Sequence, residues 1–241
     1  MLLVECRKPS KSEQDVLEQL SQMDGIAVVG YVIETSNQER ETDIIWLSPQ
    51  RATVIEVKGD PVGSPVGRLT PNLNSPWLVD GKEVSFFGST LPHLQARTSA
   101  QILSAFFREK ELSQFPFIQS AVAVSSRHLH MDSYLMAGQT LVSTTGHFAE
   151  GIRSLRNKSV KMSTAVEMLK LMDLGPKSPT LEAIVREWVS YLPPSSKERA
   201  SRAAARRRAQ MRKSVSDKVS IFIIIFLATF FIYTMFHYTH F

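Results

Sequence analysis

Cysteine is almost absent from this chain, and its scarcity limits the class of protein. Cys6 is the single cysteine among 241 residues, so no intramolecular disulfide can form. Small secreted domains commonly depend on several disulfides, whereas disulfides are rare in reducing compartments. The sequence therefore excludes a secreted disulfide scaffold and suits a reducing compartment.

Charge is absent from the C-terminal stretch 219–241, which contains no Asp, Glu, Lys or Arg. Its central part, residues 221–236, reads IFIIIFLATFFIYTMF. A helix that spans a bilayer needs about 20 mainly apolar residues. We therefore predict a transmembrane helix over residues 219–237; the alternative is a buried core strand or helix, which is usually shorter.

The net charge of +5 is concentrated in the segment just before this stretch. Residues 197–218 contain nine Lys and Arg residues against Glu198 and Asp217, and the rest of the chain is slightly acidic. Basic residues beside a span stay on the cytoplasmic side and attract anionic lipids. We expect a single-pass C-terminal membrane anchor, a cytoplasmic globular domain, and anionic lipid contact by the Arg-rich linker, although such a cluster also suits phosphate contacts to nucleic acid.

Before this linker, the pattern of apolar residues indicates one α/β domain. Apolar content is 43%, enough for one good core. Residues 33–58 hold two strands with no room for a helix between them, which argues against a doubly wound parallel sheet and favours a mixed sheet. The predicted order is helix 12–23, strands 26–33, 43–47 and 52–58, loop 60–74, helix 92–109, strands 117–125 and 139–143, and helices 148–157, 161–172 and 179–192.

The two strands 43–47 and 52–58 form a hairpin that places two acids together. A turn centred between Pro49 and Gln50 pairs Leu47 with Ala52 and brings Asp43 opposite Glu56. Like charges directly opposed across a ladder are destabilising, so a positive group is expected between them.

Lys58 lies two residues beyond Glu56 and hence on the same face of the sheet. The pair of acids is either a metal site or a solvated strand end. Hard oxygen ligands of this kind suit Mg²⁺ or Mn²⁺.

A third acid, Glu13, lies in the predicted helix 12–23 on the same stripe as Val16, Leu17 and Leu20. A carboxylate on a buried stripe needs a partner. Two interpretations stay open: Glu13 points toward the acid pair, or Ser10-x-x-Glu13 is a capping box in which the carboxylate binds the Ser10 amide.

These blocks resemble a known family. The stretch TDIIWLSP followed by ATVIEVK is similar to the nuclease-related domain, a branch of the PD-(D/E)xK nuclease superfamily. Glu13-x-x-Val16-x-x-x-Leu20 matches its first helix, Pro92-x-x-Gln95 the start of a later helix, and Trp77 a tryptophan between the two blocks. The chain departs from the family at Ser12, where glycine is usual, and at Leu91, where asparagine is common. The resemblance covers roughly residues 10–107.

The resemblance implies a restriction-endonuclease-like mixed sheet flanked by helices, and metal-assisted hydrolysis of DNA or RNA phosphodiesters. Asp43 and Glu56 would hold Mg²⁺ or Mn²⁺, with the Val57 carbonyl a further ligand and Glu13 a ligand directly or through water. Lys58 would orient the attacking water or offset phosphoryl charge, and Gln95 would position the lysine or the phosphate.

We therefore divide the chain into a nuclease-related core at 1–125, a segment completing the globular domain at 126–192, a basic linker at 193–218 and the transmembrane helix at 219–237. The expected function is that of a membrane-anchored, metal-dependent nuclease. Two other interpretations stay open: a non-catalytic module that binds nucleic acid or a partner on a nuclease fold at the membrane, and a membrane-surface scaffold that acts through its linker.

Overall fold

The computed structural model describes residues 1–48, 51–87, 89, 91–112, 117–155 and 162–174. The chain divides into two compact units, Met1–Leu192 and Pro193–Phe241. All described residues lie in the first unit, so the predicted helix 179–192, the linker 193–218 and the transmembrane helix 219–237 lie outside them. No helix within the described ranges has the length and apolar content needed to cross a bilayer.

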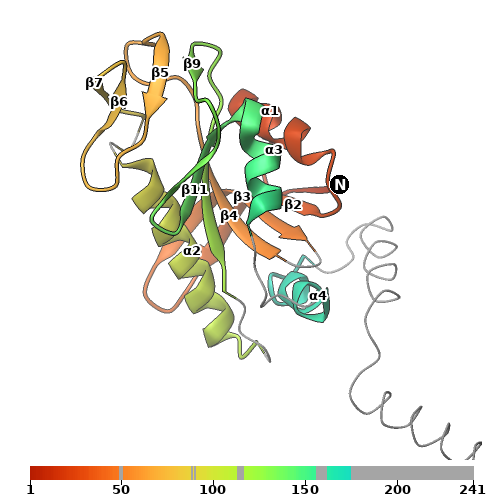
Figure 1. Ribbon diagram of the computed structural model, residues 1–241. Helices are drawn as coiled ribbons and strands as arrows, with labels where there is room; N and C mark the ends of the chain where they lie inside the picture. Colours follow the sequence, from red (N-terminus) through yellow and green to blue (C-terminus); the bar gives the residue numbers. More distant parts are fainter. Residues whose placement is uncertain (49–50, 88, 90, 113–116, 156–161, 175–241) are drawn as a thin grey trace, which may run out of the picture. The chain divides into compact units, whose positions relative to one another are not determined.

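A seven-stranded mixed sheet forms the centre of the first unit, with the strand order β1-β2-β3-β4-β8-β11-β10. The pairs β1–β2, β4–β8 and β8–β11 are parallel, and the others are antiparallel. This confirms the predicted α/β class with a mixed sheet (Figure 1). The strands are β1 (Leu2–Glu5), β2 (Ile26–Glu34), β3 (Glu39–Ser48), β4 (Arg51–Lys58), β8 (Gln119–Val124), β10 (Leu135–Ala137) and β11 (Thr140–Thr144).

Two helices cover each face of this sheet. Helices α1 (Lys11–Leu20) and α3 (Thr145–Ser154) share one apolar cluster with Ile44 and Trp46 of β3. Helices α2 (Pro92–Glu109) and α4 (Met162–Leu171) pack on the opposite face, where Ile45 and Leu47 belong to their cluster. Since successive residues of β3 point to opposite faces, its run of apolar residues is buried on both sides.

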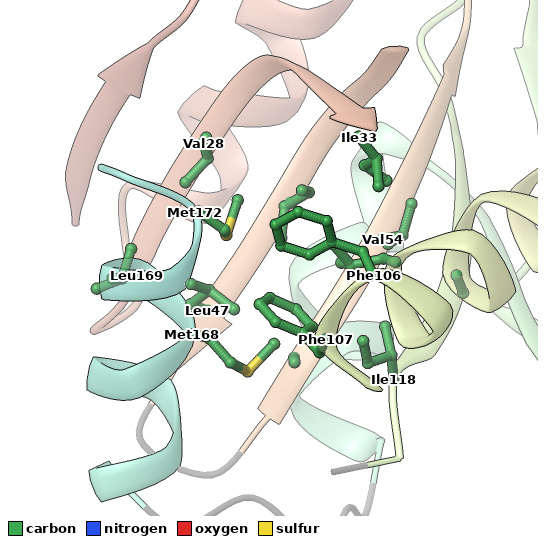
Figure 2. Packing of buried hydrophobic residues seen from close by; sticks show 14 of the residues in the cluster. Val28, Ile33, Leu47, Val54, Phe106, Phe107, Ile118, Met168, Leu169 and Met172 are labelled. Atoms are coloured by element: carbon green, nitrogen blue, oxygen red, sulfur yellow. The ribbon is translucent and has the colours of Figure 1, made fainter. Parts of the chain in front are cut away.

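Figure 2 shows how the face beneath α2 and α4 is filled. Phe106 and Phe107 reach the sheet from α2 and meet edge to face, with ring centroids 5.2 Å apart. Met168 and Leu169 reach it from α4, and all four side chains are buried. Because this aromatic pair packs against the sheet, it fixes the C-terminal part of α2 there.

The segment predicted as a loop over residues 60–74 contains a strand, so that prediction was wrong in part. It belongs to a second sheet with the order β7-β6-β5-β9 (Figure 1). These strands have two to four residues, too few to show the alternation that reveals longer strands, and β5, β6 and β7 lie in a stretch rich in glycine and proline. They are β5 (Gly67–Thr70), β6 (Trp77–Val79), β7 (Lys82–Val84) and β9 (Leu129–His130).

Candidate functional site

The predicted hairpin register is confirmed. The ladder between β3 and β4 pairs Leu47 with Ala52, and its last pair is Ile44 with Ile55. One step further, the Asp43 carboxylate replaces a main-chain acceptor, because its Oδ2 accepts the Val57 N–H at 2.7 Å. Asp43 therefore occupies the end of the ladder, in register with Glu56.

Lys58, the last residue of β4, joins three parts of the site. Its ammonium donates to Glu56 Oε1 at 2.9 Å and to Gln95 Oε1 at 3.0 Å, and lies 3.5 Å from the Phe87 carbonyl oxygen. Glu56 and Lys58 are only 6% and 7% exposed. A desolvated ion pair requires hydrogen bonds to its remaining donors, and Gln95 of α2 supplies one. The geometry thus favours the interpretation in which Gln95 positions the lysine.

The Asp43 carboxyl ionises with unusual difficulty. Burial, followed by repulsion from Glu56 and from Glu13, raises its pKa to about 7, although the Val57 N–H and Lys58 act in the opposite direction. Its side chain is still 28% exposed. At neutral pH a bound cation would counter this shift, because its charge would offset the repulsion between the two acids.

Glu13 forms the capping box of α1, so that interpretation is confirmed. The Ser10 N–H donates to Glu13 Oε2 at 2.6 Å, and the Glu13 N–H donates to Ser10 Oγ at 3.3 Å. The carboxylate has a second role, because it also accepts two hydrogen bonds from Arg7, at 2.6 and 2.8 Å. Burial opposes ionisation of Glu13, but the bonds from Arg7 and Ser10 outweigh it and hold its pKa below the ordinary value.

Arg7 is a component of the site that the sequence analysis missed. Besides Glu13 it contacts Glu41, and its Nη2 lies 3.9 Å from Asp43 Oδ1. Glu13 and Glu41 raise the pKa of Arg7, with its hydrogen bonds to Glu13 as the largest cause, so Arg7 is charged at every accessible pH. A permanent cation therefore stands near Asp43, while Lys58 binds Glu56.

Gly30 provides the space that Arg7 occupies. In the β2–β3 ladder, Gly30 and Asp43 lie between the pairs Val29–Ile44 and Tyr31–Thr42. Gly30 has φ +66°, and a Cβ built there would lie 2.1 Å from Arg7 Cγ. A glycine inside a strand often marks a bulge or the close approach of another group, and this was the available sequence signal.

The side chains at the site fit a hard divalent ion that is bound by few protein groups and completes its coordination with water or phosphate oxygens. Among the described residues there is no group of three or more His, Cys, Asp or Glu side chains arranged to hold a metal. Mg²⁺, however, commonly binds through one or two carboxylates and keeps several waters or substrate phosphate oxygens. Asp43 and Glu56 supply two carboxylates, and no hydrogen bond reaches Asp43 Oδ1 from the residues described here. The parts of Glu13 and of the Val57 carbonyl as ligands stay predictions.

His93 and Trp77 support the site without entering it. From the sequence, a histidine two residues before Gln95 would be expected to face solvent, but this expectation is wrong, because His93 is buried. Its Nε2 lies 2.8 Å from the Leu73 carbonyl oxygen, its Nδ1 accepts from Trp77 Nε1 at 3.2 Å, and the two rings are stacked. The pair fixes the start of α2 against the small sheet, two residues before Gln95.

The arrangement therefore consists of two acids and a lysine at the end of a buried hairpin in a mixed sheet. Residues 8–125 match the family model of the nuclease-related domain, which confirms the predicted resemblance over this segment. This match suggests a nuclease-like function. Searches of curated proteins and of solved structures returned no match to the chain.

Gly30→Ala should destabilise the protein. The alanine would have to adopt a positive φ, and its methyl group would displace Arg7. We therefore expect a loss of about 1–3 kcal/mol in the free energy of unfolding. Urea denaturation of the full chain in detergent measures this. Gly146→Ala is the matched control, because its Cβ would meet no atom within 4 Å. An unchanged midpoint for Gly30→Ala would show that Arg7 does not depend on this gap.

Asp43→Asn should change the pH dependence of stability without divalent cations. A carboxyl group whose pKa is raised on folding stabilises the fold fully below its unfolded pKa of about 4 and loses this contribution as pH rises to about 7. The asparagine variant should therefore gain stability relative to wild type across this window, by roughly 1–3 kcal/mol, and level off above it. Denaturation at pH 4.5 to 8 measures the gain, and exposed Asp24→Asn should show none.

Proposed function

We propose that this chain is a metal-dependent nuclease that hydrolyses nucleic-acid phosphodiesters on a restriction-endonuclease-like fold. The observation that carries the proposal is the position of Lys58, held by Glu56 and Gln95 at the end of the strand that faces Asp43. The match to the nuclease-related domain supports it independently, because residues 8–125 contain all of these residues.

In this proposal Asp43 and Glu56 hold Mg²⁺ or Mn²⁺, with the Val57 carbonyl as a further ligand. When bound, the ion would supply charge stabilisation at the phosphate and lower the pKa of a water molecule. Glu13 would take part directly or through water, and direct binding would require it to give up a hydrogen bond from Arg7.

Lys58 contributes the protein's own positive charge. Its ammonium orients the attacking water or offsets charge on the phosphoryl oxygens, while Gln95 fixes its direction. Helix α2 also begins here, at Pro92, and Leu91 before it offers no side-chain cap. The partial positive charge of a helix N-terminus adds to the attraction for phosphate.

The chain is further proposed to be anchored in a membrane by residues 219–237, with the globular domain in the cytoplasm and the linker 193–218 against anionic lipid. The uncharged stretch 219–241 and the basic segment before it support this topology. The anchor would restrict cleavage to nucleic acid that reaches the membrane surface.

The alternative is a non-catalytic module that binds nucleic acid or a protein partner on the same fold. One observation favours it: the described residues bring together two acids and no third metal-binding side chain. The outcome depends on whether two carboxylates suffice for turnover.

Cleavage by the full chain in detergent, with Mg²⁺ or Mn²⁺, tests the enzyme proposal on single- and double-stranded DNA and RNA. Asp43→Asn should abolish cleavage while the fold is kept. Lys58→Ala should lower turnover by about 100-fold or more and leave metal affinity largely intact, since the lysine is no ligand. Exposed Lys82→Ala is the control and should cleave normally. A wild-type chain that binds nucleic acid but cuts none, with affinity unchanged by Asp43→Asn, would establish the binding module.

Protease treatment of sealed membranes tests the topology. With the cytoplasmic side enclosed, the globular domain should stay intact until the membrane is opened with detergent. Digestion before detergent is added would place the domain on the outer side and overturn the proposed orientation.

A further inference from the structure

Phe87 combines high exposure with a position at the candidate site. Its side chain is 91% exposed, the highest value among the large hydrophobic residues that the structure describes. Its carbonyl oxygen is the third group near the Lys58 ammonium, at 3.5 Å. Single exposed apolar side chains are common on protein surfaces. Phe87 differs because its main chain lies beside Lys58, the residue proposed to act on the phosphate.

The neighbouring residues hold Phe87 in place. Phe86 is buried and meets Trp77 edge to face, with ring centroids 5.7 Å apart. Phe86 and Ser89 exchange two main-chain hydrogen bonds of 3.0 Å, and Ser89 Oγ accepts the Leu91 N–H at 3.0 Å. Phe87 therefore projects from a backbone that is tied on one side to the core and on the other to the start of α2.

We propose that Phe87 is a stacking platform for an unpaired nucleobase, so that the site selects single-stranded or locally unpaired nucleic acid. This inference rests on the proposed function, because it assumes a phosphodiester beside Lys58. A phosphate at that position brings an adjoining base within reach of the Phe87 ring. Every base has a π-face, and aromatic side chains are the usual platforms for bases of single strands. In a duplex these faces are already covered by neighbouring base pairs.

The backbone tether explains why this ring suits the task. Because the backbone that carries the ring is already held, only side-chain freedom is lost when a base stacks on it. Exposed Val62 lies close by, because its N–H donates to the Ser85 carbonyl oxygen at 2.9 Å. A lipid or a protein partner would contact the same two side chains, Phe87 and Val62. The experiments below distinguish these partners from a nucleobase.

The first experiment follows stacking directly, by fluorescence, in the full chain in detergent. Phe87→Trp is combined with Asp43→Asn, so that no cleavage occurs, and titrated with an oligothymidine strand and with a blunt DNA duplex. Trp46 and Trp77 are buried, and the third tryptophan, Trp188, is replaced by Phe in both the test and the control protein, so a change on binding reports on position 87. We expect quenching by the single strand and little by the duplex. Met136→Trp, at a position 47% exposed on β10, is the matched control and should not be quenched.

The second experiment measures affinity in the Asp43→Asn background. Phe87→Ala and Phe87→Leu should weaken single-strand binding about tenfold, whereas Phe87→Tyr should retain it, because only the ring stacks. Duplex binding should not change. Equal losses of affinity for single strand and duplex, or no loss for either, would overturn the proposal. In the fluorescence experiment, a blue shift of the Phe87→Trp emission with anionic vesicles, without quenching by the single strand, would also overturn it.

These outcomes are independent of turnover. If wild type cleaves nucleic acid and Phe87→Ala keeps the same preference for single strands, the stacking platform fails and the nuclease stands. If wild type cleaves nothing but Phe87→Trp is quenched by single strands alone, the enzyme proposal fails and Phe87 serves a binding module.

Discussion

The repulsion between Asp43 and Glu56 is the constraint on which the site depends. The hairpin register forces the two acids into line at the end of a buried ladder, where burial makes their charges costly. The surrounding groups answer this repulsion: the Val57 N–H binds Asp43, Lys58 binds Glu56, and Arg7 stands beside Asp43. Despite these groups, burial and then the repulsion from Glu56 raise the pKa of Asp43, and a bound divalent cation would offset that repulsion.

The rest of the fold supplies the rigidity that keeps these groups close. The hairpin is packed on both faces, so neither strand can shift in register without exposing an apolar row. Phe106 and Phe107 fix α2 on the sheet, and the stacked pair of Trp77 and His93 fixes its start. As a result Gln95 meets Lys58 at hydrogen-bond distance, although 37 residues separate them in sequence.

What could be predicted from the sequence was local or periodic. The register follows from a short turn and a period of two, and α2 was predicted with the bounds Pro92–Glu109 that it has. Arg7 and Gly30 were missed because their relation is tertiary: one follows an edge strand and the other lies in the middle of the next. His93 was misjudged because its partner Trp77 comes from a sheet whose strands are too short to recognise.

Arg7 and a metal ion would both offset the negative charge of the buried acids, but in different ways, and the difference bears on the role of Glu13. Arg7 spreads one positive charge over Glu13, Glu41 and, more distantly, Asp43, and it binds Glu13 with two hydrogen bonds. A divalent ion would place two charges at Asp43 and Glu56. Arg7 and the capping box use both oxygens of Glu13, since Oε1 accepts from Arg7 and Oε2 accepts from Arg7 and the Ser10 N–H. Direct binding of an ion by Glu13 would therefore require the loss of at least one of these hydrogen bonds.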